Sequence, residues 1–222
     1  MNSGRHKQQQ PDSKDVPKAV VSRLSLYLRE LQHLMRSGKT TISSSQLGRM
    51  LGFTDAQVRK DLACFGHFGQ PGIGYRCEDL AAAIRRILGT DRDWTVALVG
   101  VGNLGRALLG YQGFGAKGFR IVAAFDADAS KAGTSIDGIQ VHPMTHLAEV
   151  VKRHQIQLAM ITVPAAAAQS VADLALAAGV AGIVNFAPVT LSVPEHISLV
   201  GVDLATELEQ ISFSVANRGK SY

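Results

Sequence analysis

The apolar positions at the start of the chain recur every three or four residues, the spacing of one helix face. Residues 1–15 are rich in Gln, Ser, Lys and Asp, and we expect them to form a disordered lead-in. Pro17 then opens a helix that stops before Gly38. The apolar stripe of this helix consists of Val20, Val21, Leu24, Leu28, Leu31 and Met35.

Two shorter helices follow, and each starts with a capping pattern. Ser43 with Gln46 and Thr54 with Gln57 have the spacing of a capping box, in which two side chains satisfy free backbone N–H groups reciprocally. Gly52 lies at the turn between the two helices. Two short helices joined at a glycine turn predict a helix-turn-helix.

Residues 66–76 contain four glycines and one proline, a composition typical of a tight hairpin. We interpret this hairpin as a wing. An amphipathic helix over residues 78–89 closes the unit, and residues 90–93 form a linker. The pattern therefore predicts a winged helix-turn-helix domain over residues 16–90.

From Trp94 onward, apolar runs rich in Val, Ile and Ala alternate with helical patterns. This alternation predicts an α/β fold, a Rossmann-type doubly wound parallel sheet with helices on both faces. We expect the sheet domain to span residues 91–203, followed by a last helix and tail at 204–222. The expected strands are 94–100, 118–126, 138–142, 156–164, 180–188 and 197–203, and the expected helices are 103–111, 145–154, 165–179 and 204–218.

The excess positive charge lies entirely in the front part of the chain. Residues 1–80 carry twelve Lys/Arg and seven Asp/Glu, a net charge of +5, whereas residues 81–222 carry eleven of each. This asymmetry favours a polyanionic partner for the front domain. The apolar runs are too short to span a bilayer and the first residues lack a secretory signal, so we expect a cytoplasmic protein without a membrane partner.

The stretch VALVGVGNLG combines a buried strand with the G-x-G-x-x-G pattern of a dinucleotide site. Gly100 permits the tight turn, Gly102 lets the backbone approach a pyrophosphate, and Gly105 lets the helix pack against the sheet. The next strand ends at Asp126, where an acid binds the adenosine ribose and repels a 2′-phosphate. The pattern therefore favours NAD(H) over NADP(H); glycines that serve only packing are the alternative.

Two further strand ends, TVP and NFAP, would lie along the same edge of the sheet, where open α/β sheets bind ligands. Each is also compatible with a plain end to a strand. The expected cofactor-binding residues are Gly100, Val101, Gly102, Asn103, Leu104, Gly105, Asp126, Thr162, Val163, Pro164 and Asn185.

The chain lacks the usual equipment for catalysis. None of four candidate histidines ends a predicted strand beside a carboxylate, which favours surface or capping positions for His142, His146, His154 and His196. Cys64 and Cys77 have no partner motif between them, so we expect no disulfide framework; a redox-active pair is the alternative. No residues remain for a substrate domain after the nucleotide fold and its last helix. We therefore expect no catalytic residues, no metal, and a cofactor that acts as a signal.

The motifs together resemble one known family. In chain order they are QVRKDL, the glycine-rich GHFGQPGIGY, VGVGNLG, GYQGFG, a strand ending in FD, TVP, NFAP and a closing helix. From about Pro17 to about Asn217, this order is similar to that of the Rex family of redox-sensing transcriptional repressors. The resemblance implies a homodimer that represses by binding a palindromic operator when NAD⁺ dominates and is released when NADH binds.

The resemblance also implies that the last helix is exchanged between subunits. Leu204, Leu208, Ile211 and Val215 form one apolar stripe that no domain of its own remains to cover. The alternative is a helix that folds back on its own subunit.

Family roles carry over to particular residues. Arg59 and Lys60 in QVRKDL would face the major groove, and Arg is a common partner of guanine. The implied DNA-binding set also contains Gln57, Ser43, Ser44, Ser45 and the wing residue Gly72. The implied switch residues are Tyr111 near the nicotinamide, the acid Asp203, and its basic partner Arg29. For Lys60 and Tyr111, plain surface positions are the alternative.

Two positions depart from the family pattern. The wing tip has Gln70-Pro71 where relatives usually carry a basic residue that enters the minor groove. Because a cation is attracted to that negative groove, we expect weaker operator binding or a relaxed preference for A·T-rich flanks. Leu204 stands where some relatives place an aromatic ring, so ring stacking on the nicotinamide is not expected here.

Two other functions stay open from the residues. One is a small NAD-dependent oxidoreductase with a basic accessory domain, disfavoured by the missing acid–base group. The other is a different nucleotide- or CoA-binding regulator. An acid at Asp126 fits a ribose with a free 2′-hydroxyl and fits CoA poorly.

Overall fold

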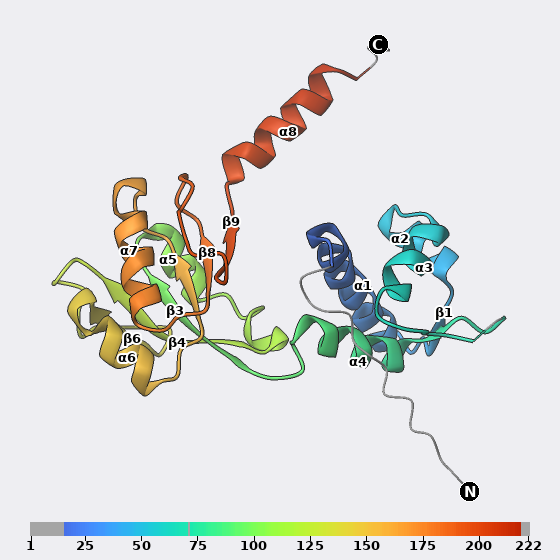
Figure 1. The fold of residues 1–222 in the computed structure, drawn as a ribbon, viewed down its shortest axis with the longest axis horizontal. Coiled ribbons are helices and arrows are strands. Elements are labelled where there is room, and N and C mark those ends of the chain that lie inside the picture. Colours follow the sequence, from blue (N-terminus) through green and yellow to red (C-terminus); the bar gives the residue numbers. More distant parts are fainter. Residues whose placement is uncertain (1–15, 71, 219–222) are drawn as a thin grey trace, which may run out of the picture. The chain divides into compact units, whose positions relative to one another are not determined.

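The computed structural model describes residues 16–70 and 72–218, so the expected lead-in at 1–15 lies outside the described residues, as does Pro71. The described residues divide into two compact units, with the boundary between Arg92 and Asp93. Figure 1 shows both, coloured along the sequence. Each unit has the elements that the apolar periodicity predicts: mainly helices in the first unit, and strands alternating with helices in the second.

The first unit is a small helical domain with a two-stranded ribbon. Its elements are α1 (Lys18–Arg36), β1 (Thr41–Ile42), α2 (Ser44–Leu51), α3 (Asp55–Ala63), β2 (Tyr75–Arg76) and α4 (Cys77–Leu88). The predicted stripe of α1 contributes Leu24 and Leu31 to the core, where they are fully buried with Leu47 of α2 and Val58 of α3. These contacts hold the two helices of the helix-turn-helix against α1.

The capping residues place the starts of α2 and α3. Ser43 and Gln46 form the complete predicted capping box, with both hydrogen bonds at 3.1 Å. The box predicted for α3 is only half formed. Thr54 accepts from the backbone N–H of Gln57, but the Gln57 side chain donates to Asp61 instead of returning to Thr54. The side-chain amide of Gln57 therefore binds the buried carboxylate of Asp61, one turn further along α3, and the second hydrogen bond of the capping box is not made.

The predicted wing is shorter than a full hairpin. A single antiparallel bridge joins Gln70 to Gly74 at the tip. Beyond it, Tyr75 and Arg76 pair with Ile42 and Thr41 of β1. The ribbon is thus made with a segment before the helix-turn-helix, which is why a pattern confined to residues 66–76 did not reveal its partner strand.

The second unit is a seven-stranded sheet in the order β5-β6-β4-β3-β7-β8-β9. All pairs are parallel except β5 with β6. The six parallel strands follow the 3-2-1-4-5-6 order of two βαβαβ halves, which confirms the predicted doubly wound sheet. The strands are β3 (Trp94–Val99), β4 (Phe119–Asp126), β5 (Ser135–Ile136), β6 (Ile139–Pro143), β7 (Leu158–Ile161), β8 (Gly182–Asn185) and β9 (Ser198–Gly201).

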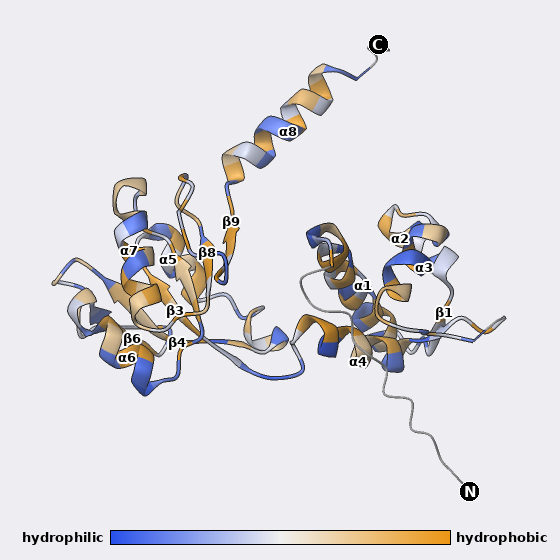
Figure 2. Ribbon diagram, viewed as in Figure 1, coloured by the Kyte–Doolittle hydropathy of each residue, from blue (hydrophilic) through white to orange (hydrophobic). Residues whose placement is uncertain are grey.

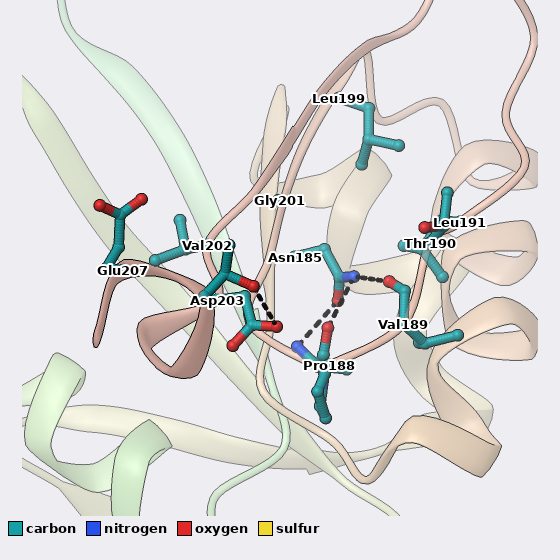
Figure 3. Close-up of a pocket in the computed structure, with 12 residues that line it drawn as sticks. Asn185, Pro188, Val189, Thr190, Leu191, Leu199, Gly201, Val202, Asp203 and Glu207 are labelled. Carbon is teal, nitrogen blue, oxygen red and sulfur yellow. Dashed lines mark hydrogen bonds between the residues drawn. The ribbon is translucent and has the colours of Figure 1, made fainter. Parts of the chain in front are cut away.

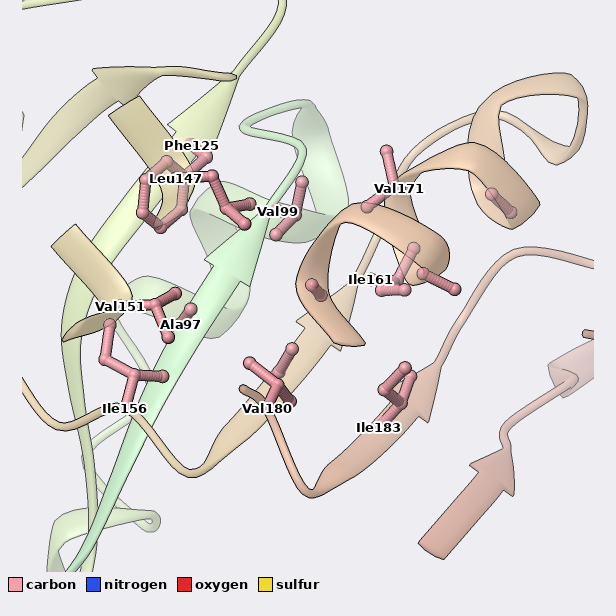
Figure 4. Packing of buried hydrophobic residues seen from close by; sticks show 14 of the residues in the cluster. Ala97, Val99, Phe125, Leu147, Val151, Ile156, Ile161, Val171, Val180 and Ile183 are labelled. Atoms are coloured by element: carbon pink, nitrogen blue, oxygen red, sulfur yellow. The ribbon is translucent and has the colours of Figure 1, made fainter. Parts of the chain in front are cut away.

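Helices cover both faces of this sheet. Figure 4 shows Ala97 and Val99 of β3 packed with Phe125 and Ile161 on the face covered by α6 (Leu147–Arg153) and α7 (Ala165–Ala177). Leu98 lies between them in sequence and points to the other face. There it packs with Leu109 of α5 (Asn103–Leu109) and with Ala124 of β4. Burial on both faces explains the unbroken apolar run Val96–Val99 within β3.

The last helix, α8 (Leu204–Ala216), has no buried residue. Its apolar residues are visible along its length in Figure 2. Five large apolar side chains are between 56% and 67% exposed: Leu204, Leu208, Ile211, Phe213 and Val215. Among the described residues, no helix combines the length and apolar character needed to cross a bilayer.

Candidate cofactor and DNA-binding sites

The sheet has one topological switch point, between the adjacent strands β3 and β7. The helix after β3 covers one face and the helix after β7 covers the other, so a crevice opens at the carboxyl ends of these strands. The glycine loop lies at the end of β3 and Thr162 follows β7. The topology therefore brings the predicted cofactor residues of four strands to one edge.

Two of the three loop glycines are required by the chain itself. Gly100 has a φ of +100°, and a Cβ there would lie 2.8 Å from the carbonyl carbon of Thr162. A Cβ on Gly105 would lie 2.0 Å from the carbonyl oxygen of Gly100. Both positions exclude a side chain for reasons of packing and backbone conformation.

Gly102 differs from the other two. Its φ is −82°, which any residue adopts, and a Cβ there would meet nothing within 4 Å. Among the described residues, the backbone N–H groups of Gly102 and Asn103 have no acceptor, as expected at a helix N-terminus. The chain gives no internal reason for glycine at this exposed position, so it fits a group from outside that approaches the backbone closely, as a pyrophosphate does.

Asp126 is held firmly at the end of β4. Its carboxylate accepts from the N–H of Val101 in the glycine loop at 2.7 Å, from the N–H of Asp128 at 2.9 Å, and from the ammonium of Lys131 at 3.0 Å. Burial alone would raise the pKa of Asp126, but these three donors outweigh it and the pKa lies below its usual value. The site thus presents an ionised acid beside the loop, as ribose recognition requires.

The TVP segment supports the loop rather than standing apart from it. The Thr162 hydroxyl lies 2.6 Å from the carbonyl oxygen of Gly100 and 3.1 Å from that of Val99, so β7 is tied to the end of β3. Val163 fills the space beside Gly100, and Pro164 precedes α7. Any contact that these residues make with a dinucleotide adds to this supporting role.

Asn185 also has a structural task. It is 2% exposed; its amide nitrogen donates to the carbonyls of Ala187 and Val189, and its oxygen accepts from the N–H of Ala187. The side chain therefore shapes the loop after β8 and has no free donor for a ligand.

This loop borders a pocket of about 530 Å³ at the carboxyl ends of β8 and β9 (Figure 3). Asp203 and Glu207, at the start of α8, give the pocket two carboxylates. Asp203 caps α8 by accepting from the N–H of Ala205 at 2.9 Å. The pocket belongs to the half of the sheet that takes the second nucleotide in dinucleotide-binding folds.

Tyr111 is not brought to this crevice within one chain. A Cβ on the preceding Gly110 would lie 3.1 Å from the carboxylate of Asp137, which lies in the turn before β6 at the amino edge of the sheet. Tyr111 is 58% exposed, and its ring packs edge-on against that of Phe114, with ring centroids 4.9 Å apart. The expected place near the nicotinamide is therefore not reached from the same chain.

The exposed face of α3 carries the two predicted groove residues. Arg59 and Lys60 are both exposed. Arg59 donates to Asp55 at 2.6 Å and to Ser44 at 3.3 Å. Because exposed ion pairs of this kind contribute little, Arg59 is free to exchange Asp55 for a base edge or phosphate. Ser45 is exposed beside the cap of α2.

The opposite side of α3 is anchored by a buried acid that sequence reasoning missed. Asp61 is 1% exposed and accepts two hydrogen bonds from Arg23 of α1, at 2.5 and 2.8 Å. It also accepts from the hydroxyl of Tyr27 and the amide of Gln57, at 2.8 and 2.7 Å. Gln57, expected near DNA, is thereby held toward the core. The Gln-to-Asp spacing of four residues was the available signal, but it also fits an exposed helix pair.

The other predicted residues are exposed or lie at turns. Arg29 lies on the exposed side of α1 and Gly72 in the wing, where its φ is +81°. Lys131 was also missed, because a lysine five residues after the strand-ending acid carries no recognised pattern.

Among the described residues, no group of three or more His, Cys, Asp or Glu side chains is placed to hold a metal ion.

A helix-turn-helix unit with an exposed basic face, followed by a dinucleotide-type crevice, defines a class of protein: DNA-binding regulators that carry a nucleotide site. Residues 15–63 match the family model described as a putative DNA-binding protein N-terminus, and residues 91–189 match that of a CoA binding domain. These matches divide the chain as its fold does.

Curated relatives match nearly the whole chain. The redox-sensing transcriptional repressor Rex of Desulfitobacterium hafniense is 48% identical over 91% of this chain and 97% of its own length, and that of Streptomyces griseus is 43% identical over 96% and 84%. Crystal structures of the Rex-family repressor RSP match with TM-scores of 0.87 for its complex with β-NAD⁺ and operator DNA and 0.83 for its complex with β-NADH. Their identities are 34% and 32%, covering 91% and 92% of this chain and 93% and 95% of RSP. This chain belongs to the Rex family of redox-sensing transcriptional repressors.

Proposed function

We propose that this protein binds operator DNA as a homodimer, holds it in the presence of NAD⁺, and releases it when NADH binds. The observation that carries the proposal is a pyrophosphate-type loop, with a Gly102 that the chain itself does not need, on the same short chain as a helix-turn-helix. RSP, its relative, has been crystallised with NAD⁺ and operator DNA and with NADH. We place such a protein in the cytoplasm, the compartment that contains both the operator DNA and the NADH that it senses.

In this proposal, the glycine loop binds the pyrophosphate through the free backbone N–H groups of Gly102 and Asn103, and Asp126 binds the adenosine ribose. Arg59 and Lys60 contact the major groove, with Ser43–Ser45 at the phosphates. Arg29, Tyr111 and Asp203 take part in the switch. The exposed position of Tyr111 at the amino edge of its own sheet is compatible with a contribution to the partner's site.

A sensor must bind NADH more tightly in the conformation that does not bind DNA, because equal affinity for both conformations shifts nothing. By linkage, the operator must then weaken NADH binding by the same factor as NADH weakens operator binding. We therefore expect a lower NADH affinity, measured by calorimetry, when the protein is saturated with operator duplex. An unrelated duplex at the same salt concentration is the control, and an unchanged NADH affinity on operator would contradict the proposal.

The homodimer rests on α8. Its stripe of Leu204, Leu208, Ile211 and Val215 is exposed, and Phe213 exposes a further ring on the opposite side. Leaving such side chains in water costs roughly 1.5–3 kcal/mol each relative to burial. A helix that is apolar on two sides is suited to insertion between surfaces of a second copy.

Introducing a charge into the stripe with Ile211→Asp is therefore expected to convert the dimer to a monomer, halving the mass measured by light scattering. Because Ile211 is exposed within one chain, the folded units themselves should stay intact. Gln210→Asp adds the same charge outside the stripe and is the matched control. A dimer that survives Ile211→Asp as well as it survives the control would show that α8 does not hold the two copies together.

The oxidoreductase alternative is not favoured, because the relatives are transcriptional repressors. A turnover assay that follows NADH consumption separates the two functions.

A further inference from the structure

Lys131 is bound to the acid of the ribose site. Its ammonium lies 3.0 Å from the Oδ2 atom of Asp126 and 3.9 Å from a carboxylate oxygen of Asp128. The Lys131 side chain is 27% exposed and that of Asp126 is 11% exposed. The ion pair is therefore partly shielded from water, where it is stronger than an open surface pair.

The Asp126 carboxylate has few free acceptor sites. An ionised carboxylate accepts about four hydrogen bonds, and three are already made within the chain. Two of the donors, Val101 and Asp128, are backbone N–H groups fixed by the loop. Lys131 is the one donor on a flexible side chain. A ribose that places two hydroxyls on this carboxylate must therefore displace the ammonium, which stays tethered five residues away.

We propose that Lys131, together with Asp126, sets the selectivity of the nucleotide site between NADH and NADPH. This inference rests on the proposed function, because it concerns the adenosine half of the same site. The Asp126 carboxylate repels the 2′-phosphate of NADPH, whereas the Lys131 ammonium attracts it. The discrimination is the balance of two opposed charges at the 2′ position and is weaker than the acid alone would give.

The variant Lys131→Met removes the attraction and keeps a side chain of similar length. We expect the ratio of NADH affinity to NADPH affinity, measured by direct titration, to rise on the order of tenfold. Lys117→Met is the matched control, because Lys117 is an exposed lysine of the same unit at the other edge of the sheet. The neighbouring Gly118 carbonyl accepts a hydrogen bond from the N–H of Trp94, at the amino end of β3. This control should leave the ratio unchanged.

A substitution of Asp126 tests the repulsion of the 2′-phosphate by the carboxylate. Asp126→Asn removes the repulsion and releases Lys131, so NADPH affinity should rise relative to NADH. The double variant Asp126→Asn/Lys131→Met should lose that gain. Because the two single variants move the ratio in opposite directions, a loss of folding in either one cannot mimic the pattern, and melting temperatures confirm that the variants are folded.

The inference is overturned if Lys131→Met changes both affinities by the same factor, or if Asp126→Asn and the double variant bind NADPH equally. Absence of detectable NADPH binding in every variant, including Asp126→Asn, would also overturn it. If the unaltered protein fails to bind NADH, the proposed function fails, which is a separate result.

Discussion

Replacing Asp61 with alanine is expected to destabilise the first unit by about 3–5 kcal/mol, the range for breaking a buried ion pair from one side. Asp61 is almost completely buried on the inner side of α3 and holds Arg23, Tyr27 and Gln57 at once. Its removal leaves these donors without their acceptor. Because the Arg23 side chain is 21% exposed and regains some hydration, the lower end of the range applies.

Urea unfolding followed by circular dichroism measures this loss. Asp55→Ala is the matched control, because Asp55 is an acid on the same helix whose ion pair with Arg59 is exposed, and it should cost within about 1 kcal/mol. Equal destabilisation by both variants would contradict the anchoring role of Asp61.

The same network makes a prediction about pH. Burial would raise the pKa of Asp61, but hydrogen bonds from Arg23, Tyr27 and Gln57 outweigh it, so its pKa in the folded unit lies below the usual value. A lowered pKa contributes stability that is present above the unfolded pKa of about 3.9 and is lost as pH falls through the folded value. We therefore expect the stability difference between the unaltered protein and Asp61→Ala to hold at neutral pH and shrink below about pH 4.

Alanine substitutions at Gly102 and Gly105, three residues apart, are expected to have different effects on stability and on NADH binding. Gly105→Ala should destabilise the second unit by about 3 kcal/mol or more, beyond ordinary overpacking, because its Cβ would meet the backbone oxygen of Gly100. Gly102→Ala should leave stability unchanged, because its Cβ meets nothing. It should nevertheless weaken NADH binding about tenfold to a hundredfold, since losing one charge-assisted hydrogen bond costs roughly 1.5–3 kcal/mol.

Thermal unfolding and NADH titration of the same two variants distinguish packing from ligand contact. A Gly102→Ala protein that binds NADH normally would mean that no ligand approaches this part of the loop. A Gly105→Ala protein of normal stability would mean that the helix start can move away from Gly100.

Local patterns predicted the elements because each depends on neighbours in sequence. The stripe of α1, the box of Ser43 and Gln46, and the glycine loop before α5 are each defined by spacings of at most four residues between successive positions. The parallel, doubly wound character of the sheet followed from the alternation of strands and helices, since parallel strands need crossovers. The order of the strands came only from the structure.

Long-range partners were not predictable in the same way. The bond between Asp61 and Arg23 joins residues 38 apart, and the pairing of β2 with β1 joins segments on either side of the helix-turn-helix. Asn185 was assigned to the cofactor from its place at a strand end, although its amide is used by its own loop. A strand end marks where a ligand site lies, but only the hydrogen-bond partners decide which side chains remain free to reach it.

If the dinucleotide acts as a signal for DNA binding, the fluorescence anisotropy of a labelled palindromic operator duplex must respond to it. The complex with this protein is titrated with NADH and, separately, with NAD⁺ at one salt concentration, because affinity for DNA depends steeply on salt. We expect NADH to lower the anisotropy to that of free duplex and NAD⁺ to leave the complex intact. Identical curves for the two forms would contradict this expectation.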